Sequence, residues 1–172
     1  MQWDYSYFFP PMATAGHVTR SGNRPMHFAC SVAMSVCFGM DLDLTRLSDE
    51  NKTVCAGAIS AYKQIRDVTQ GGDLYRLEDP HDHFRGALNF VTPDQSRAVV
   101  FVFQLKDGQP LAVRPAGLDP ARRYTLREMN PAPGRDKMAD EGKTMTGEDL
   151  MRDGFVPSCK NPVEASVIQL GS

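Results

Sequence analysis

The stretch that decides the fold is ALNFVTPDQSRAVVFVFQL, residues 87–105. Two apolar runs of strand length flank the segment TPDQS, which carries the Pro, Asp and Ser residues typical of a turn. The pattern therefore predicts two neighbouring strands joined by a short connection.

Further short apolar or alternating runs continue this pattern through the second half of the chain. They are LYRL (74–77), LAVRP (111–115), RYTLREM (123–129) and ASVIQL (165–170), separated by turn segments such as KDGQP and GLDPA. Together they predict an antiparallel β-sandwich of about six to eight strands. The segment NPAPGRDKMADEGK, residues 130–143, is rich in Pro, Gly and charge and is predicted to be a mobile loop.

The first 70 residues have different patterns. In WDYSYFF, residues 3–9, every odd position is aromatic. This alternation predicts a strand whose one face is entirely aromatic. The run MHFACSVAMSVCF, residues 26–38, is apolar nearly all round and predicts a buried helix that stops at Gly39. A second helix is predicted to begin after the N-cap residue Ser48 and to end at the Gly71-Gly72 break.

The composition is that of an ordinary globular protein. The chain has 172 residues, of which 41% are hydrophobic and 23% charged, and its formal net charge is −2. Lysines and arginines are scattered among acidic neighbours, which argues against nucleic-acid binding. No apolar run approaches the roughly 18 residues that a membrane span needs. The start MQWDYSYFF lacks a basic n-region, so it is not expected to be a signal peptide.

The four cysteines form no CxxC pair and no zinc spacing. Cys30 and Cys37 lie in the helix predicted over residues 26–38, where seven positions correspond to roughly 10 Å, beyond the roughly 7 Å reach of a disulfide. We therefore expect buried, inert thiols at Cys30, Cys37, Cys55 and Cys159, with an unforeseen bridge as the alternative.

A series of short segments, each weakly specific alone, occurs in a distinctive order. They are Pro10-Pro11, Gly16-His17-Val18, GMDLDLTRLS (39–48), AYKQIR (61–66), GDLYRL (72–77), FVTPDQSRAVVFVFQL (90–105) and GEDLMRDGFVP (147–157). In this order and spacing the chain resembles the C-terminal quarter of glycoside hydrolase family thirty-six, the retaining α-galactosidases and their relatives.

The resemblance implies an α+β chain. Residues 1–70 would be the last strand and helices of a (β/α)8 barrel, and residues 71–172 an antiparallel β-sandwich. The strand at residues 3–9 would be the eighth of the barrel, with the loop 10–25 at its C-terminal end, where barrel active sites are built. Separated from the barrel, residues 3–22 are expected to be disordered or to pair with another copy, and a homo-oligomer is expected.

The resemblance also implies an activity. The parent enzyme would remove terminal α-linked galactose from oligosaccharides with retention, without a metal or an organic cofactor. Retaining glycosidases use two carboxylates about 5 Å apart, one as nucleophile and one as general acid/base. In the family both are aspartates upstream of the matching region, so we expect this chain to contain no catalytic residue and to be inactive alone.

Asp41 and Asp43 are the one pair of carboxylates within the chain that invites a catalytic interpretation. In an extended segment they would point to one side, with Cα atoms roughly 6.5 Å apart. A retaining mechanism needs groups on opposite faces of the sugar ring, and these two share one short segment. We expect them not to be the catalytic pair.

His17 and Asn23, in the loop 10–25, are the candidate substrate-binding residues. As planar polar groups they can hydrogen-bond to a sugar hydroxyl, or His17 to a barrel carboxylate. The alternative is that His17 and Gly16 fix the loop backbone. The family often carries a longer Asn-His-Gln-Thr-Gly-Arg-like stretch where this chain has Ser21 to Arg24, which leaves the subsite open.

The remaining histidines are interpreted as structural. In DPHDHF, His81 and His83 are two residues apart and could bind a metal, but no third ligand is suggested, so we expect a solvated turn. His27 is expected to be a packed helix residue.

Two other interpretations stay open. One is a stand-alone carbohydrate-binding β-sandwich, although beyond residue 103 only Tyr124 and Phe155 are aromatic and no Trp is present. The other is that the parent is an α-N-acetylgalactosaminidase or a galactosyl transferase acting on raffinose-type sugars. For the parent's compartment, the cytoplasm is favoured and the periplasm stays open.

Overall fold

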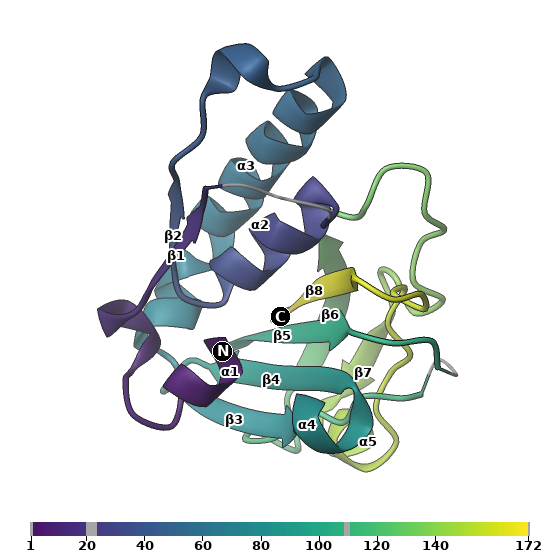
Figure 1. Ribbon diagram of the computed structural model, residues 1–172. Helices are drawn as coiled ribbons and strands as arrows, with labels where there is room; N and C mark the ends of the chain where they lie inside the picture. Colours follow the sequence, from purple (N-terminus) through teal and green to yellow (C-terminus); the bar gives the residue numbers. More distant parts are fainter. Residues whose placement is uncertain (1, 20–23, 109–110, 172) are drawn as a thin grey trace.

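The computed structural model describes residues 2–19, 24–108 and 111–171 of the chain. Within these residues a six-stranded sheet and a two-stranded sheet are connected by helices (Figure 1). The two long helices lie together on one side of the larger sheet. The α+β class expected from the sequence is confirmed.

The larger sheet is antiparallel throughout, in the order β3-β4-β5-β8-β6-β7. Its strands are β3 (Asp73–Glu78), β4 (Arg85–Val91), β5 (Arg97–Gln104), β6 (Arg123–Met129), β7 (Thr144–Thr146) and β8 (Glu164–Gly171). The antiparallel sheet predicted for this half is confirmed and is consistent with a β-sandwich domain. The run LAVRP was predicted as a strand, but within the described chain it forms only an isolated bridge between Val113 and Phe155.

The stretch at residues 87–105 forms the predicted pair of strands. β4 pairs antiparallel along its whole length with residues 98–104 of β5. At the turn between them, the Thr92 N–H donates to the Arg97 carbonyl at 2.9 Å. The Asp94 carboxylate accepts from the Thr92 hydroxyl at 2.7 Å and from the Ser96 N–H at 3.0 Å, and these bonds lower the pKa of Asp94 to about 2. The turn chemistry thus fixes the register of the hairpin.

The smaller sheet is a parallel pair formed by β1 (Ala15–Val18) and β2 (Cys37–Met40), connected through helix α2 (Met26–Met34). Helix α2 packs directly on β1, because a Cβ added to Gly16 would lie 2.9 Å from the Ala33 Cα and 2.7 Å from the Val36 Cγ2. Only glycine therefore allows this close approach of helix and strand.

Helix α3 (Asp49–Gly71) follows a single 3-10 turn, η2 (Leu44–Arg46). The Ser48 hydroxyl accepts from the Asn51 N–H at 3.2 Å, as expected of the predicted N-cap. The second predicted helix is confirmed in both its start and its end. No helix among the described residues is both long and apolar enough to cross a membrane.

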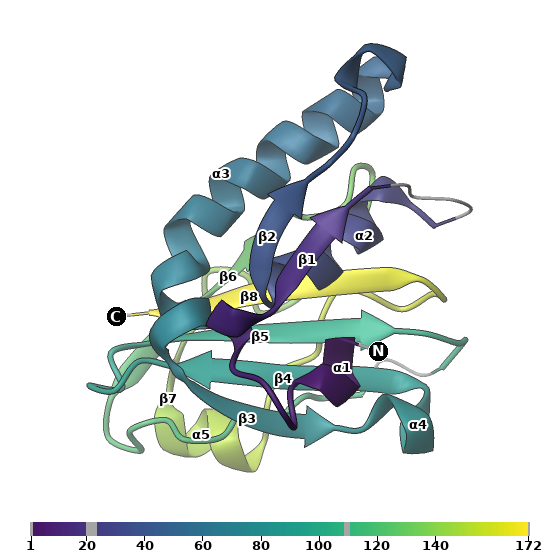
Figure 2. The ribbon, with the colours of Figure 1, turned by 60° about the vertical axis from the view of Figure 1, so that its left-hand side comes forward.

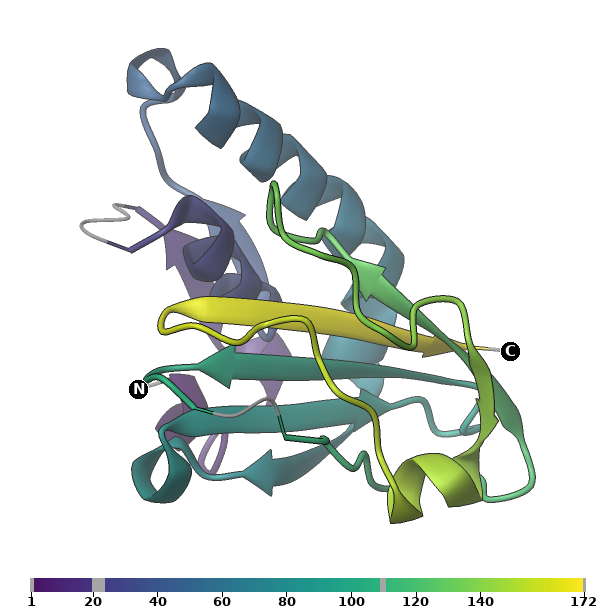
Figure 3. The ribbon, with the colours of Figure 1, turned by 90° about the vertical axis from the view of Figure 1, so that its right-hand side faces the viewer.

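Both faces of the larger sheet are covered. On one face, side chains of β4, β5, β6 and β8 share a core with α2 and α3 that includes Leu88, Phe90, Val99, Phe101, Met129, Val167, Met34, Ala58, Ile65 and Val68. On the other face the core includes Val91, Val100, Val102, Tyr124, Leu126, Ile168, Leu170, Leu150 and Phe155. This second core is closed by α5 (Gly147–Arg152) and by irregular segments, which lie in front of the strands in Figure 3.

The prediction of a strand over residues 3–9 is wrong. Residues Gln2–Tyr5 form the short helix α1, and turns follow, in which the Ser6 N–H donates to the Trp3 carbonyl at 3.1 Å. A lone strand would leave its backbone groups unpaired, whereas a helical turn satisfies them locally. Trp3 packs into the chain's own core at 8% exposure. The Arg76 side chain hydrogen-bonds to Ser6, so residues 3–9 lie against the chain's own sheet. Residues 20–22 of the segment expected to be disordered or paired with another copy lie outside the described residues.

The first predicted helix is shorter than expected. It ends at Met34 rather than at residue 38, and Cys37 begins β2. The apolar run continues without a break because Phe38 and Met40 also pack against the helix-side core, but with the alternation of a strand. Cys30 and Cys37 are therefore not in one helix.

Residues 130–143 are irregular, as predicted, but they are anchored rather than free. The Arg135 Nη2 lies 2.8 Å from the Glu128 Oε1, and the two side chains are only 10% and 3% exposed. The Ser158 hydroxyl also donates to the Glu128 Oε1, at 2.6 Å. Met138 is buried in the core beneath. A buried ion pair thus holds this segment against β6.

His27 gives the fold a dependence on pH. It is 7% exposed and its Nε2 lies 2.6 Å from the Asn130 carbonyl, and burial lowers its pKa from the ordinary value of 6.5. Below about pH 6.5 the imidazole of His27 is protonated in the unfolded chain more readily than in the folded chain. The free energy of unfolding should therefore fall as the pH drops below about 6.5. We expect the urea midpoint to decrease from pH 7.5 to pH 5.5, and to decrease less in His27→Gln. Equal slopes in both proteins would contradict this.

Candidate functional site

The parallel pair β1–β2 has one covered and one uncovered face. Alternate side chains pack toward the helices: Val18 from β1, and Phe38, Met40 and the following Leu42 from β2. The opposite face carries the intervening residues, which we call the open face: Ala15, His17, Thr19, Cys37, Gly39 and Asp41. Figure 2 shows β1 and β2 in front of α2, with no described element over them.

His17 lies in the middle of this open face. The structure places it in β1 rather than in the loop where it was predicted, opposite Gly39 in the register of the pair. Its ring lies directly over Gly39, since a Cβ added there would be 3.5 Å from the His17 Nε2. His17 is exposed. The other candidate, Asn23, lies outside the described residues.

The carboxyl ends of β1 and β2 meet at one edge of the open face. In a parallel pair both strands end on the same side, and here the next residues are Thr19 after β1 and Asp41 after β2. The Asp41 N–H donates to the Val18 carbonyl at 3.1 Å, which extends the pairing by one residue. His17 and Asp41 therefore share one face and approach the same edge.

Asp43 has a different role from Asp41. Its carboxylate accepts from the Thr45 N–H at 3.0 Å and from the Thr45 hydroxyl at 2.6 Å, and it forms an ion pair with Arg46 at 3.1 Å. It is the N-cap of η2. The two aspartates are therefore not equivalent members of one carboxylate pair.

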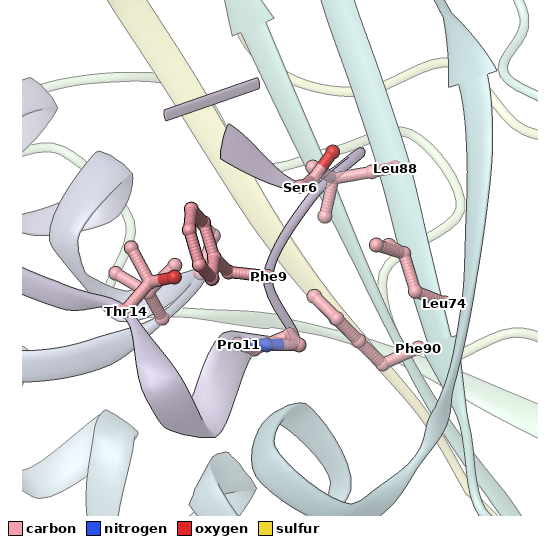
Figure 4. A pocket seen from close by; sticks show the side chains of 9 residues that line it. Ser6, Phe9, Pro11, Thr14, Leu74, Leu88 and Phe90 are labelled. Atoms are coloured by element: carbon pink, nitrogen blue, oxygen red, sulfur yellow. The ribbon is translucent and has the colours of Figure 1, made fainter. Parts of the chain in front are cut away.

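A cavity of about 460 Å³ lies beside β1, between α2 and the larger sheet. Its walls are largely apolar and include Trp3, Phe28 and Phe103 as well as Gly16 and His17 of β1. The Trp3 indole N–H is buried at this position without a partner among the described residues. A second cavity, between the N-terminal arm and β3–β4, has only about 10 Å³ and is closed by Phe9, Pro11, Leu74 and Phe90 (Figure 4). It has room for about one water molecule, so it is not a sugar site.

The segment DPHDHF forms a single helical turn, α4 (Pro80–His83), between β3 and β4, and His81 in it is exposed, as expected of a solvated turn. The His81 Nε2 lies 2.9 Å from the Asp4 carboxylate, which raises the pKa of His81. The described residues contain no cluster of three or more His, Cys, Asp or Glu that could hold a metal ion. His81 is thus a contact between α4 and the N-terminal arm.

The cysteines are free thiols, as predicted. Cys30, Cys55 and Cys159 are buried and Cys37 is half-buried. Burial raises the pKa of Cys30 to about 12 and also raises the pKa values of Cys55 and Cys159. A thiol is a nucleophile only as thiolate, so none of these three is activated.

The comparison with known families agrees with this architecture. Residues 85–170, half of the chain, match the model of the glycosyl hydrolase family 36 C-terminal domain. Alpha-galactosidase 1 of Pediococcus pentosaceus is 35% identical over 133 residues, which cover 72% of this chain and 18% of that protein. Alpha-galactosidase Mel36A of Lactobacillus acidophilus is 33% identical over 151 residues, covering 83% of this chain and 20% of that protein.

The similarity extends to solved structures. The α-galactosidase AgaA of Geobacillus stearothermophilus, in a crystal structure of a variant in complex with stachyose, superposes with a TM-score of 0.84 at 27% identity. The match covers 99% of this chain and 23% of AgaA. A second AgaA variant was solved in complex with raffinose, with a TM-score of 0.83 at 26% identity. The chain thus spans about a fifth of the length of the relatives it matches.

The antiparallel sheet following a parallel β-α-β unit is therefore that of a glycoside hydrolase C-terminal region. More particularly, this chain belongs to glycosyl hydrolase family 36 and corresponds to the C-terminal part of its α-galactosidases. The resemblance found from the sequence motifs is confirmed.

Proposed function

We propose that this chain is the C-terminal part of a retaining α-galactosidase that removes terminal α-linked galactose from oligosaccharides. The observation that carries the proposal is the superposition over 99% of the chain on an α-galactosidase solved with stachyose. The relatives named above are α-galactosidases as well. The substrates proposed are α-galactoside oligosaccharides of the raffinose and stachyose type.

In this proposal residues 1–70 complete the catalytic barrel and residues 71–172 form the C-terminal β-sandwich domain. Two parallel strands joined through a helix that covers one face are the repeating unit of a (β/α)8 barrel. The barrel segment is thus β1–α2–β2–α3, and not the aromatic stretch at residues 3–9. The open face then lines the barrel interior, and the ends at Thr19 and Asp41 lie at the catalytic side.

The catalytic carboxylates are proposed to lie outside this chain. A retaining enzyme needs a nucleophile and an acid/base about 5 Å apart, on opposite sides of the scissile bond. Asp43 is engaged as a cap, and Asp41 lies on the same short segment. The chain on its own is therefore expected to bind weakly at best and to be inactive.

The stereochemistry of the whole enzyme tests this function. Proton NMR during hydrolysis of 4-nitrophenyl α-galactoside should show α-galactose first, with β-galactose appearing later by mutarotation. Release of the β-anomer first, or no hydrolysis, would contradict the proposal. Faster turnover of 4-nitrophenyl α-N-acetylgalactosaminide, or transfer from raffinose to an acceptor sugar, would assign the enzyme to the other activities considered for the family.

His17 is proposed to bind substrate or to hydrogen-bond to a barrel carboxylate, with Asn23 as a second candidate. Its imidazole is exposed on the open face and lies over Gly39. Because glycine has no side chain, no neighbouring side chain at this position covers the ring. Losing one hydrogen bond at the substrate should lower kcat/KM by about 3- to 10-fold in His17→Ala of the whole enzyme. Cys37→Ala, on the same face at its opposite end, is the control and should stay at the wild-type value. An unchanged kcat/KM in His17→Ala would refute the contact.

We also propose that the whole protein is a homo-oligomer. Tyr7, Phe8 and Phe9 are 58%, 79% and 52% exposed, and Met12 nearby is 63% exposed. Adjacent exposed apolar side chains of this size favour association.

A further inference from the structure

We propose that Asp41 is a substrate-binding residue, whose carboxylate accepts hydrogen bonds from hydroxyl groups of the bound α-galactoside. The inference deepens the proposed function and rests on it. It assigns Asp41 to sugar recognition and gives it no part in the covalent chemistry.

The position of Asp41 is fixed by its neighbours on both sides in sequence. Met40 and Leu42 pack into the helix-side core, so the residue between them is turned to the open face, where it is exposed. The bond from its N–H to the Val18 carbonyl ties its backbone to β1. The Asp41 side chain is thus presented from a backbone held by strand pairing, which gives it a defined position.

Asp41 and His17 are diagonal neighbours on the open face, because His17 is on β1 and Asp41 follows β2. His17 is opposite Gly39, and Asp41 is two residues beyond Gly39, roughly 6.5 Å further toward the carboxyl ends of the strands. A monosaccharide ring has hydroxyl groups spread over a similar width. The two side chains can therefore contact different hydroxyls of one sugar or of adjacent sugars.

The carboxylate of Asp41 is available for this role. No hydrogen bond or ion pair engages its side chain among the described residues, whereas the oxygens of Asp43 are taken by Thr45 and Arg46. An ionised carboxylate is an acceptor only, with two oxygens that can bind two donors. Sugar hydroxyls are such donors, and hydrogen bonds to a charged partner are the stronger ones.

The test compares two amide substitutions in the whole enzyme. Asp41→Asn should raise KM for 4-nitrophenyl α-galactoside so that kcat/KM falls by about 10- to 100-fold, the loss of a charge-assisted hydrogen bond, while kcat stays within a few fold. Asp43→Asn is the matched control, two residues away. It keeps a side-chain oxygen as the cap of η2 and loses only the exposed ion pair with Arg46, so the melting temperature should stay close to the wild-type value and kcat/KM within about twofold of it.

A second measurement identifies the bond itself. The same variants are assayed on aryl α-galactosides that lack one hydroxyl each. On the analogue that lacks the hydroxyl bound by Asp41, wild type and Asp41→Asn should have the same kcat/KM, because the hydrogen bond between that hydroxyl and Asp41 is already absent. Asp41→Ser provides a second variant with the same expected pattern, should the amide perturb folding.

The outcomes separate this inference from the function on which it rests. Asp41→Asn and Asp41→Ser that keep the wild-type kcat/KM would overturn the inference while α-galactosidase activity stands. A loss in kcat alone at unchanged KM, or an equal loss on every deoxy analogue, would also overturn it. A whole enzyme that does not hydrolyse α-galactosides would overturn the proposed function, and this inference with it.

Discussion

Replacing Phe101 with Ala is expected to lower the free energy of unfolding of this chain by about 3–5 kcal/mol. Phe101 is fully buried in β5, between β4 and β8 of the larger sheet. Its ring packs edge-on against Phe90 at 5.9 Å between centroids and stacks on Phe103 at 6.2 Å. Truncation removes this apolar contact and leaves a cavity under α2 and α3 that a six-stranded sheet cannot close.

Urea unfolding followed by circular dichroism measures this loss. Phe101→Leu is the control, since it keeps most of the volume and should cost less than about 1.5 kcal/mol. A cost below 1 kcal/mol for Phe101→Ala would mean that the helices do not pack on this face of the sheet.

Separating the buried ion pair of Glu128 and Arg135 is expected to cost about 3–5 kcal/mol for either single substitution. In Glu128→Leu the Arg135 guanidinium stays buried with its Nε and Nη1 already without partners among the described residues. In Arg135→Met the Glu128 carboxylate keeps only the bond from Ser158. Each single variant therefore leaves an uncompensated charge in the core.

The double variant Glu128→Leu with Arg135→Met separates the cost of an orphaned charge from the loss of the pair. With both charges removed, stability should recover to within about 2 kcal/mol of the wild type, because apolar replacements of buried pairs are often nearly neutral. The urea midpoints of the wild type, the two single variants and the double variant together form a double-mutant cycle. Additive losses in the double variant would show that the two side chains do not act as a pair.

The antiparallel half could be predicted from sequence because its signals are local. Two apolar runs of strand length and the turn residues Thr92 to Ser96 between them specify the hairpin without reference to the rest of the chain. The same holds for α3, whose N-cap Ser48 and terminal Gly72 lie next to a clear helical stripe.

The errors fall where one pattern fits two structures. Aromatic residues at alternate positions from 3 to 9 match a strand. A strand needs a neighbouring strand, which this segment lacks, so it forms a short helix and turns instead. The run at residues 26–38 is apolar throughout, so periodicity could not show where α2 ends and β2 begins. Glu128 and Arg135 gave no signal, since their burial results from the path of the loop after β6.

The candidate site was predicted in part. His17 was chosen for its residue type and its polar surroundings, and the register with β2 supplied what the sequence could not: its face and its neighbour Gly39. The D-x-D spacing suggested one pair of equivalent carboxylates. Capping of η2 by Asp43 separates the two, and only the alternation of Met40 and Leu42 assigns Asp41 to the open face.

We propose that this chain supplies part of the frame and of the sugar-binding surface of an α-galactosidase, while the catalytic carboxylates come from elsewhere in the protein. Initial rates on 4-nitrophenyl α-galactoside, measured side by side for residues 1–172 and for the whole enzyme at equal concentration, test it most directly. We predict clear turnover by the whole enzyme and none above the buffer rate by residues 1–172 alone. Hydrolysis by the isolated chain, or none by the whole enzyme, would contradict the claim.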